Sequence, residues 1–325
     1  MTESSMPPTE TRTIPRDRHA ISRKDISPSA LRVLYRLHES GYAAHLVGGA
    51  VRDLLLGEHP KDFDVATDAT PEQVKHLFRN CRLIGRRFRL AHVVYGREII
   101  EVATFRANSD DGSGDRETDE DGRVLRDNVY GTIEDDAVRR DFTANALYYS
   151  IADFSVRDDV GGFEDVNNRV LKLIGDPETR YREDPVRMLR AVRLAAKLKF
   201  TIDPATAAPL PVLAPLLREA AAARLFEECL KLFLSGHAEA SFLGLEAHGL
   251  LPALLPETAK ALTKVMKSSP VISSFYAPKR PWSVTVSINL VVQRAWAMSW
   301  QPVLKSPLQS SVPNIISHDF NIIFT

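Results

Sequence analysis

Cysteine, net charge and long apolar segments are scarce in this sequence. Among its 325 residues are two cysteines, Cys81 and Cys229, which stand far apart and lack the spacing of a metal-binding motif. This scarcity argues against a disulfide scaffold and indicates a reducing compartment, so we expect the cytoplasm. The 42 Lys and Arg residues balance 42 Asp and Glu residues, so the overall charge points to neither a nucleic-acid nor a membrane partner. A polyanion would have to be bound by a local cluster of charges.

Apolar segments long enough to act as targeting signals are also missing. Residues 1–26 are polar, contain proline and have no apolar core of a signal peptide, which predicts a flexible leader. No later run approaches the roughly 18 apolar residues of a membrane span. The chain does have 44% hydrophobic residues, enough for sizeable cores. Because single cores stop growing near about 250 residues, this length favours two domains or one large domain with an appendage.

From residue 27 to residue 175 the pattern alternates between helices and strands. Apolar residues at helical spacing predict a helix over 27–40, and Thr70 with Gln73 forms a capping-box pattern at the start of another. A further helix is expected to begin near Asp141. Short strands are expected at 42–47 and 62–67, a short helix at 50–57, a hairpin of two strands at 91–96 and 98–106, and short extended segments at 155–162 and 170–175. Residues 107–123 hold seven acids without periodicity, which predicts a mobile loop.

After residue 175 the pattern becomes helical and then changes abruptly. Segments within 176–257 have apolar residues at spacings of three and four, which predicts an all-helical domain. Residues 260–325 contain all three Trp and seven Lys or Arg, but the single acid Asp319. We therefore predict a leader at 1–26, a mixed domain at 27–175, a helical domain at 176–257 and an atypical tail of unknown fold at 258–325. The composition of the tail suggests a divergent or frame-shifted end.

Two aspartates stand two residues apart in the segment KDFDV. In a strand, Asp62 and Asp64 would project from the same face while Phe63 and Val65 turn into a core. Two carboxylates on one face repel each other unless a cation lies between them, and Mg²⁺ prefers oxygen ligands of this kind. Paired ions of this type catalyse in-line displacement at phosphorus. The plain alternative is a pair of surface aspartates beside Lys61.

A glycine pair precedes the aspartates in LVGGAVRD. Gly48 and Gly49 follow an expected strand and precede an expected helix, so backbone N–H groups could approach an anion there. The same pair would serve equally as a tight turn. Arg52 could contact phosphate or pair with Asp53. A third carboxylate to complete a metal site would come from Asp141 or Glu101. Asp141 could equally be a helix cap, and Glu101 could equally be an exposed strand residue.

Several ordered motifs occur together: LVGGAVRDLLLG, KDFDVAT, EVATFR, RRDFTANALYY and YREDPVRMLRAVRLAAKL. Over residues 19–256 this combination resembles the class II nucleotidyltransferases, the family of bacterial poly(A) polymerases and CCA-adding tRNA enzymes. The resemblance implies an α+β fold, in which a polymerase-β-like head with a small mixed sheet is followed by an all-α domain. The chain leaves the family pattern near residue 257, where such enzymes continue into further helices and a basic extension.

The resemblance also implies roles for individual residues. Asp62 and Asp64 would bind two Mg²⁺ ions, with Asp141 of RRDFT as the third acidic residue, favoured over Glu101. The nucleotide-binding residues would be Gly48, Gly49, Arg52, Arg140, Asp184 and Arg187, of which Asp184 and Arg187 would face the incoming base. Asp184 followed by Pro185 is also a good helix start.

Basic residues provide candidate contacts to RNA phosphates, which dominate affinity for nucleic acids. The candidates are Arg86, Arg87 and Arg89 near the active site, and Arg190 and Arg193 on a helix. They could equally form an ordinary solvated face, which is the favoured interpretation for Lys197. Segments CRLIGRRFRLAHVVYG and HAISRKDIS resemble the poly(A) polymerase branch of the family.

The sequence thus predicts template-independent transfer of AMP from ATP to an RNA 3′ end, with release of pyrophosphate. The first alternative is CCA addition to tRNA, which would use the same catalytic residues. The second is a catalytically inactive RNA-binding relative, favoured by the atypical tail.

Overall fold

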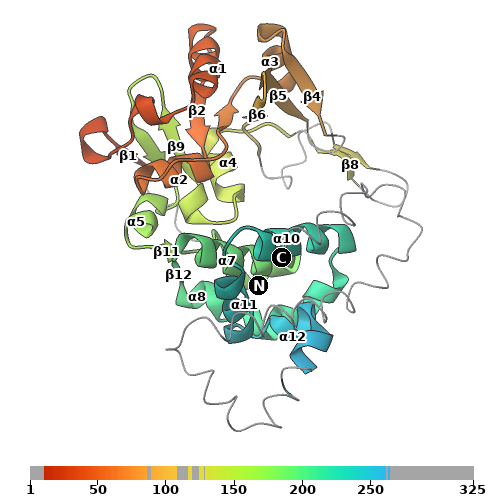
Figure 1. The fold of residues 1–325 in the computed structure, drawn as a ribbon. Coiled ribbons are helices and arrows are strands. Elements are labelled where there is room, and N and C mark those ends of the chain that lie inside the picture. Colours follow the sequence, from red (N-terminus) through yellow and green to blue (C-terminus); the bar gives the residue numbers. More distant parts are fainter. Residues whose placement is uncertain are drawn as a thin grey trace, which may run out of the picture. The chain divides into compact units, whose positions relative to one another are not determined.

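The structure is a computed structural model that describes residues 11–85, 89–107, 116–118, 124–127, 129–260 and 263. The chain divides into two compact units. The first comprises Met1–Arg180 with Leu198–Ala207, and the second comprises Tyr181–Lys197 with Ala208–Thr325. Most of the predicted tail at 258–325 lies outside the described residues, which Figure 1 draws as a grey trace.

An eight-stranded mixed sheet organises the first unit, in the order β1-β10-β9-β2-β3-β6-β5-β4. Its strands are β1 (Arg12–Ile14), β2 (Ala44–Val47), β3 (Asp64–Thr67), β4 (Cys81–Ile84), β5 (Leu90–Tyr95), β6 (Glu98–Thr104), β9 (Leu147–Ser150) and β10 (Val156–Asp158). β3 pairs with β6 in parallel, and the other pairs in this sheet are antiparallel. The predicted α+β class and the β5–β6 hairpin are confirmed.

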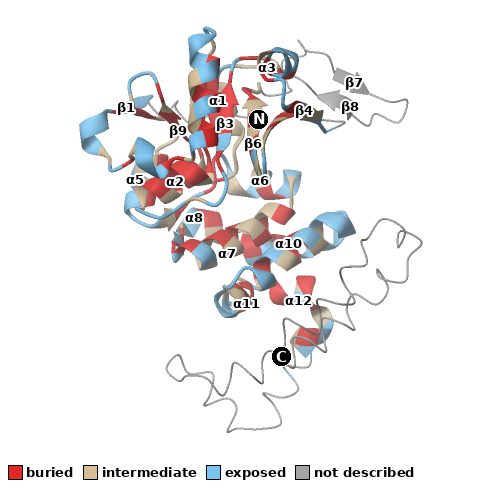
Figure 2. Ribbon diagram, turned by 45° about the horizontal axis from the view of Figure 1, so that its top comes forward, coloured by how far each residue is buried: buried red, intermediate tan, exposed pale blue. Residues whose placement is uncertain are grey.

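Short helices stand between or after the strands of this sheet along the chain. They are α1 (Pro28–Glu39), α2 (Gly49–Leu55), α3 (Pro71–Leu77), α4 (Ile133–Arg139), α5 (Gly162–Asn167) and α6 (Pro177–Glu183). Of these, α1, α2 and α3 pack on the sheet. α1 packs on β2, β3 and β6 through buried residues such as Val33, Leu34 and Leu37, and Figure 2 shows its outer side exposed. The capping box predicted for α3 is present, since Thr70 and Gln73 bond reciprocally.

Three expectations about this unit are wrong. The leader predicted to reach residue 26 already forms β1, which pairs with β10, and short 3-10 turns at Arg16–Arg18 and Arg23–Asp25. The acidic loop predicted at 107–123 contains one strand, β7 (Arg116–Thr118), which pairs with β8 (Val124–Asp127) just beyond the loop, because backbone pairing requires no apolar periodicity. The helix expected near Asp141 is a 3-10 turn at Thr143–Asn145 followed by β9, since a short apolar run fits a buried strand as well as a helix.

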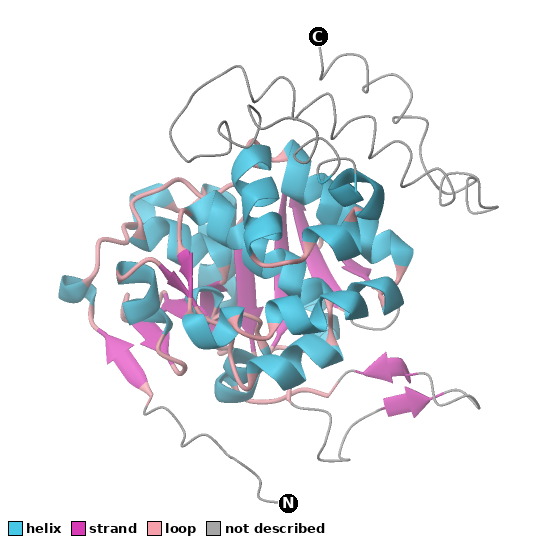
Figure 3. Ribbon diagram, turned by 90° about the horizontal axis from the view of Figure 1, so that it is seen from below, coloured by secondary structure: helices cyan, strands magenta, loops and turns pink. Residues whose placement is uncertain are grey.

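Helices make up the described part of the second unit, coloured cyan in Figure 3. They are α7 (Val186–Leu198), α9 (Leu210–Leu213), a 3-10 helix (Ala214–Glu219), α10 (Ala222–Leu234), α11 (Ala238–Ala247) and α12 (Leu251–Leu254). α10 packs on α11, and a methyl group on Gly244 of α11 would lie 2.8 Å from Val192. Residues 198–207 return to the first unit, where β12 (Thr201–Ile202) pairs with β11 (Val170–Leu171) and is followed by α8 (Pro204–Ala207).

Candidate active site

The carboxylate pair lies where β3 begins. Asp64 is the first residue of this strand, and in the sheet it is opposite Val47 of β2 and Glu101 of β6. Asp62 and Asp64 are both exposed, whereas Phe63 is 7% exposed and Val65 is fully buried. The predicted alternation is therefore confirmed, and it leaves both carboxylates facing away from the core.

The charges around Asp64 are unbalanced. Asp64 is exposed as a whole residue, yet the surrounding protein partly desolvates its carboxylate. This desolvation, followed by the negative charges of Glu101 and Asp62, raises the pKa of Asp64 to about 6, although Arg140 and His92 act in the opposite direction. The effects of Arg140 and His92 therefore do not offset the desolvation and the neighbouring carboxylates, so the ionised form of Asp64 is disfavoured.

Glu101 is the carboxylate placed opposite Asp64, and it acts on Asp64 more strongly than Asp62 does. Its Oε2 lies 3.3 Å from Nε2 of His92 on the neighbouring strand β5. In the described part of the chain no three His, Cys, Asp or Glu side chains are already gathered as a metal site. Asp62, Asp64 and Glu101 nevertheless offer only oxygen donors, which is the ligand chemistry that Mg²⁺ prefers.

Asp141 follows α4 at the end of the RRD motif. Its backbone carbonyl accepts a hydrogen bond of 2.9 Å from the N–H of Ile174. Asp141 is not among the carboxylates that act most strongly on Asp64, which are Glu101 and Asp62. The strand register places Glu101 opposite Asp64, and the metal-binding role of Asp141 stays a prediction.

The glycine pair forms the turn from β2 into α2. Gly48 has φ +75° and ψ −139°, a conformation that side chains disfavour. A methyl group on Gly48 would lie 3.7 Å from Nη1 of Arg140, and one on Gly49 would lie 3.2 Å from Nη2 of Arg52. Two guanidinium groups thus approach the turn, and one of them belongs to a segment almost a hundred residues later in the chain.

Arg52 of α2 is buried next to this turn and is restrained by hydrogen bonds. It is 3% exposed, and its Nε and Nη2 donate to Oδ1 of Asp53 at 2.8 and 2.6 Å. Its Nη1 donates to Oδ1 of Asn145. The pair with Asp53, one of two possibilities that the sequence left open, is confirmed. A direct contact of Arg52 with phosphate remains a prediction.

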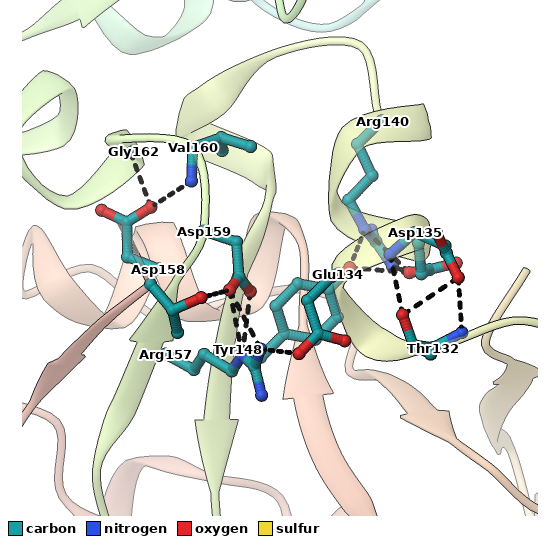
Figure 4. Close-up of polar contacts among 12 residues, drawn as sticks. Thr132, Glu134, Asp135, Arg140, Tyr148, Arg157, Asp158, Asp159, Val160 and Gly162 are labelled. Carbon is teal, nitrogen blue, oxygen red and sulfur yellow. Dashed lines mark hydrogen bonds and ion pairs between the residues drawn. The ribbon is translucent and has the colours of Figure 1, made fainter. Parts of the chain in front are cut away.

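Arg140 is bonded to two residues that the sequence analysis did not select, Asp136 of α4 and Tyr148 of β9 (Figure 4). Asp136 and Arg140 are four residues apart, a spacing that could have suggested the ion pair. Nothing in the sequence indicated Tyr148, because the segment around it was taken for a helix.

The residues expected to meet the base belong to the second unit. Asp184 accepts a hydrogen bond of 3.2 Å from the N–H of Val186 at the start of α7, and its other oxygen pairs with Arg224 at 2.7 Å. The interpretation of Asp184 as a helix start is therefore confirmed. Arg187 donates to Glu183 at 2.9 Å. Base recognition by Asp184 and Arg187 stays a prediction.

Several of the expected RNA contacts have partners within the protein. Arg89 pairs with Glu72 at 2.5 Å, and Arg193 pairs with Glu228, whose side chain is only 5% exposed. The guanidinium of Arg193 therefore has a buried carboxylate as its partner within the protein, and its contact with RNA stays a prediction. Arg190 is half-buried on α7. Arg86 and Arg87 lie outside the described residues.

None of the described helices combines the length and the apolar character that crossing a membrane requires.

Comparison with protein families gives two matches. The model for the poly A polymerase head domain matches residues 44–172, which include the glycine turn, both aspartates and the RRD motif. The model described as a probable RNA and SrmB-binding site of polymerase A matches residues 199–262.

Individual relatives fall into two groups. Poly(A) polymerase I of Salmonella typhi is 61% identical over 254 residues, which cover 77% of this chain and 55% of the relative. Poly(A) polymerase I of Haemophilus influenzae is 51% identical over 75% of this chain and 55% of its own length. The CCA-adding enzyme of Lactobacillus helveticus is 36% identical over 67% of this chain and 53% of its own. The chain thus spans little more than half the length of these curated relatives.

Among solved structures, the Bacillus stearothermophilus CCA-adding enzyme in complex with CTP superposes with a TM-score of 0.61 at 34% identity. The superposition covers 71% of this chain and 55% of that one.

Proposed function

This chain belongs to the nucleotidyltransferase family of poly(A) polymerases and CCA-adding enzymes, and from that membership we propose that it transfers AMP from ATP to the 3′ hydroxyl of RNA. Pyrophosphate is the other product. The observation that carries the proposal is the raised pKa of Asp64, about 6, beside Glu101 and Asp62 and next to the glycine turn. The divalent metal ions that accompany a nucleoside triphosphate would bring positive charge to these carboxylates, and the glycine turn lies beside them.

Polymerases of this kind use ATP and divalent metals, and we propose two Mg²⁺ ions here. Asp62 and Asp64 would hold them, with Glu101, which lies opposite Asp64, or Asp141 of the RRD motif as the third ligand. Such ions lower the pKa of an attacking hydroxyl and neutralise charge on the transferred phosphoryl group.

The protein itself contributes mainly by positioning. Gly48 and Gly49 leave room for phosphate oxygens next to the backbone. Nη1 of Arg140 faces the same turn, so its charge stabilises the triphosphate and the pyrophosphate that leaves. The ion pair of Arg52 with Asp53 restrains the Arg52 side chain next to Gly49 at the start of α2.

Adenine selection is assigned to Asp184 and Arg187 of the second unit, as the resemblance implies. The higher identity to poly(A) polymerases, 51 to 61% against 36% for the CCA-adding enzyme of Lactobacillus helveticus, favours ATP as the substrate. RNA binding is supported by the family match at residues 199–262. Arg86, Arg87, Arg89 and Arg190 remain the proposed contacts to RNA phosphates.

The test is extension of a labelled oligoribonucleotide by the full chain with Mg²⁺, in parallel reactions with ATP alone and CTP alone. Long products with ATP on an arbitrary primer support poly(A) synthesis. CTP incorporation restricted to tRNA without its 3′ end would instead establish the CCA-adding alternative. RNA binding without incorporation of either nucleotide would contradict the proposal and identify an inactive RNA-binding relative.

A further inference from the structure

Arg140 is restrained by hydrogen bonds to Tyr148 and Asp136 through two of its three guanidinium nitrogens, and Figure 4 shows its side chain beside Tyr148. Its Nε donates to the hydroxyl of Tyr148 at 3.0 Å and to Oδ2 of Asp136 at 3.2 Å, and its Nη2 donates to the same oxygen at 2.9 Å. Nη1 takes no part in these bonds. It lies 3.7 Å from the point where a methyl group on Gly48 would stand.

The two partners of Arg140 also hold each other. The Tyr148 hydroxyl donates to Oδ2 of Asp136 at 2.7 Å, so the three side chains form a closed triangle. Tyr148 is fully buried, and the guanidinium carbon lies 5.2 Å from the centre of its ring. The side chain of Asp136 is 13% exposed. The triangle joins α4 to β9, so neither partner can turn away without disturbing the core.

We propose that Tyr148 and Asp136 are positioning residues that aim Nη1 of Arg140 at the triphosphate bound on the Gly48 turn. This inference rests on the proposed function of the same site. Neither residue touches the nucleotide in this account, because both face the opposite edge of the guanidinium.

The physical reason is pre-organisation. A long arginine side chain loses rotamer freedom when it binds a phosphate, and that loss weakens binding unless the side chain is already ordered. Here the ion pair and the tyrosine hydroxyl order Arg140 before the nucleotide arrives. The contact therefore affects ligands with a polyphosphate chain, whereas it leaves the recognition of base and ribose unchanged.

The chain offers a closely matched control for this idea. Tyr149 is the next residue of β9, points to the opposite face and is 1% exposed, and none of the hydrogen bonds found for the described residues involves its hydroxyl. Tyr148→Phe and Tyr149→Phe each remove one buried hydroxyl from the same strand. Only the first removes a bond to Arg140.

The experiment measures the KM for ATP, the KM for the RNA primer, and calorimetric binding of tripolyphosphate and of AMP to the full-length chain. Tyr148→Phe is expected to raise the KM for ATP and the Kd for tripolyphosphate by about three- to tenfold, the effect of losing one such hydrogen bond. The KM for RNA and the Kd for AMP should stay at the wild-type values. Tyr149→Phe should change none of these four quantities.

A second pair of variants guards against a folding defect at Tyr148. Asp136→Asn removes the negative charge that holds Arg140 and should weaken tripolyphosphate binding more than Tyr148→Phe does. Asp135→Asn removes the same charge from the neighbouring residue, which caps α4 through Thr132 and does not bond Arg140. It should lower the melting temperature while leaving tripolyphosphate binding unchanged.

Equal effects of Tyr148→Phe and Tyr149→Phe would overturn the inference. So would a parallel loss of AMP and tripolyphosphate affinity in Asp136→Asn, because that pattern indicates general damage. Failure of the proposed function itself gives a different result, in which the wild-type chain neither incorporates AMP nor binds tripolyphosphate.

Discussion

Asp64 illustrates how a single residue can lower stability while serving a site. Its pKa is raised to about 6 by partial desolvation and by Glu101 and Asp62, so at neutral pH its ionised form destabilises the folded protein. This destabilising contribution appears as the pH rises above the usual aspartate value near 3.8. A carboxylate with a pKa perturbed in this way is typical of a functional site, where a bound cation would neutralise its charge.

We therefore expect Asp64→Asn to raise the melting temperature in the presence of a chelator at pH 7.5. The neutral amide removes the repulsion with Glu101 and Asp62 while keeping the size of the side chain. Asp62→Asn, at an exposed position before the strand begins, should have a smaller effect. Differential scanning calorimetry measures both, and a clear fall in the melting temperature of Asp64→Asn would argue that its carboxylate has a structural partner.

His45 of β2 predicts a pH dependence of stability that is separate from the ionisation of the carboxylates. Its ring packs beside Phe105 and Tyr148, with ring centres 6.1 and 6.3 Å away, and its buried Nδ1 has no hydrogen-bond partner among the described residues. Burial, together with the charge of Arg157, lowers the pKa of His45 from 6.5 to about 4. The folded state thus binds fewer protons than the unfolded chain between these values. Its stability contribution is complete above pH 6.5 and is lost as the pH falls towards 4.

The expected loss from His45 is about 2 kcal/mol between pH 7 and pH 5. His45→Gln, which does not titrate, should flatten the dependence of unfolding free energy on pH in this range. His38→Gln, at an exposed position of α1, is the control and should leave the dependence as in the wild type. Urea unfolding at several pH values provides the measurement. Identical curves for wild type and His45→Gln would rule out a buried neutral His45.

Elements of regular structure show which sequence signals are reliable here. The start of α3 was predictable because Thr70 and Gln73 form a local capping box that depends on neighbouring residues alone. The common face of Asp62 and Asp64 followed from the two-residue period of a strand. The identity of β9 was not predictable in the same way. Tyr148 and Tyr149 are buried on opposite faces, so the strand lacks the polar alternation that distinguishes it from a helix.

The missed strand also explains why part of the site was missed. The bonds of Arg140 to Tyr148 depend on β9 lying beside α4, which is a tertiary arrangement that spacing along the chain does not encode. Glu101 was left as a second choice for the same reason, because its place opposite Asp64 follows from the parallel pairing of β3 with β6. The motif residues were predictable from sequence, whereas the residues that orient them were not.

The helical unit predicts a structural role for an arginine first considered for RNA. Arg193 of α7 pairs with Glu228 of α10, and their side chains are 18% and 5% exposed. Arg193→Ala should lower the free energy of unfolding by about 3 kcal/mol, because it leaves a buried carboxylate without its main partner. The companion change Glu228→Gln should recover part of this loss in the double variant.

Chemical denaturation of the single and double variants, together with RNA affinity of each folded protein, checks this assignment. Affinity should stay close to the wild-type value in the double variant. If Arg193→Ala keeps full stability but binds RNA weakly, the arginine contacts RNA and the ion pair is incidental.

At the scale of the whole molecule, two regions of the chain each match a different family model. The family match at residues 44–172 falls on the unit with the carboxylates, and the match at 199–262 falls mostly on the helical unit that carries Asp184 and Arg187. The curated relatives extend well beyond the aligned region, since it covers 55% of the Salmonella typhi protein. The proposed nucleotide transfer is assigned to the first part, so we expect it to be retained even where binding of a long RNA differs.

The most direct test of the central claim is Mg²⁺-dependent incorporation of labelled AMP by the full chain, compared with Asp62→Ala and Asp64→Ala at matched melting temperature. The account predicts incorporation by the wild-type chain and a loss of at least about a thousandfold in each variant, since each removes a ligand on which charge neutralisation at phosphorus depends. Folded variants that incorporate AMP at the wild-type rate would contradict the assignment of these carboxylates to the reaction.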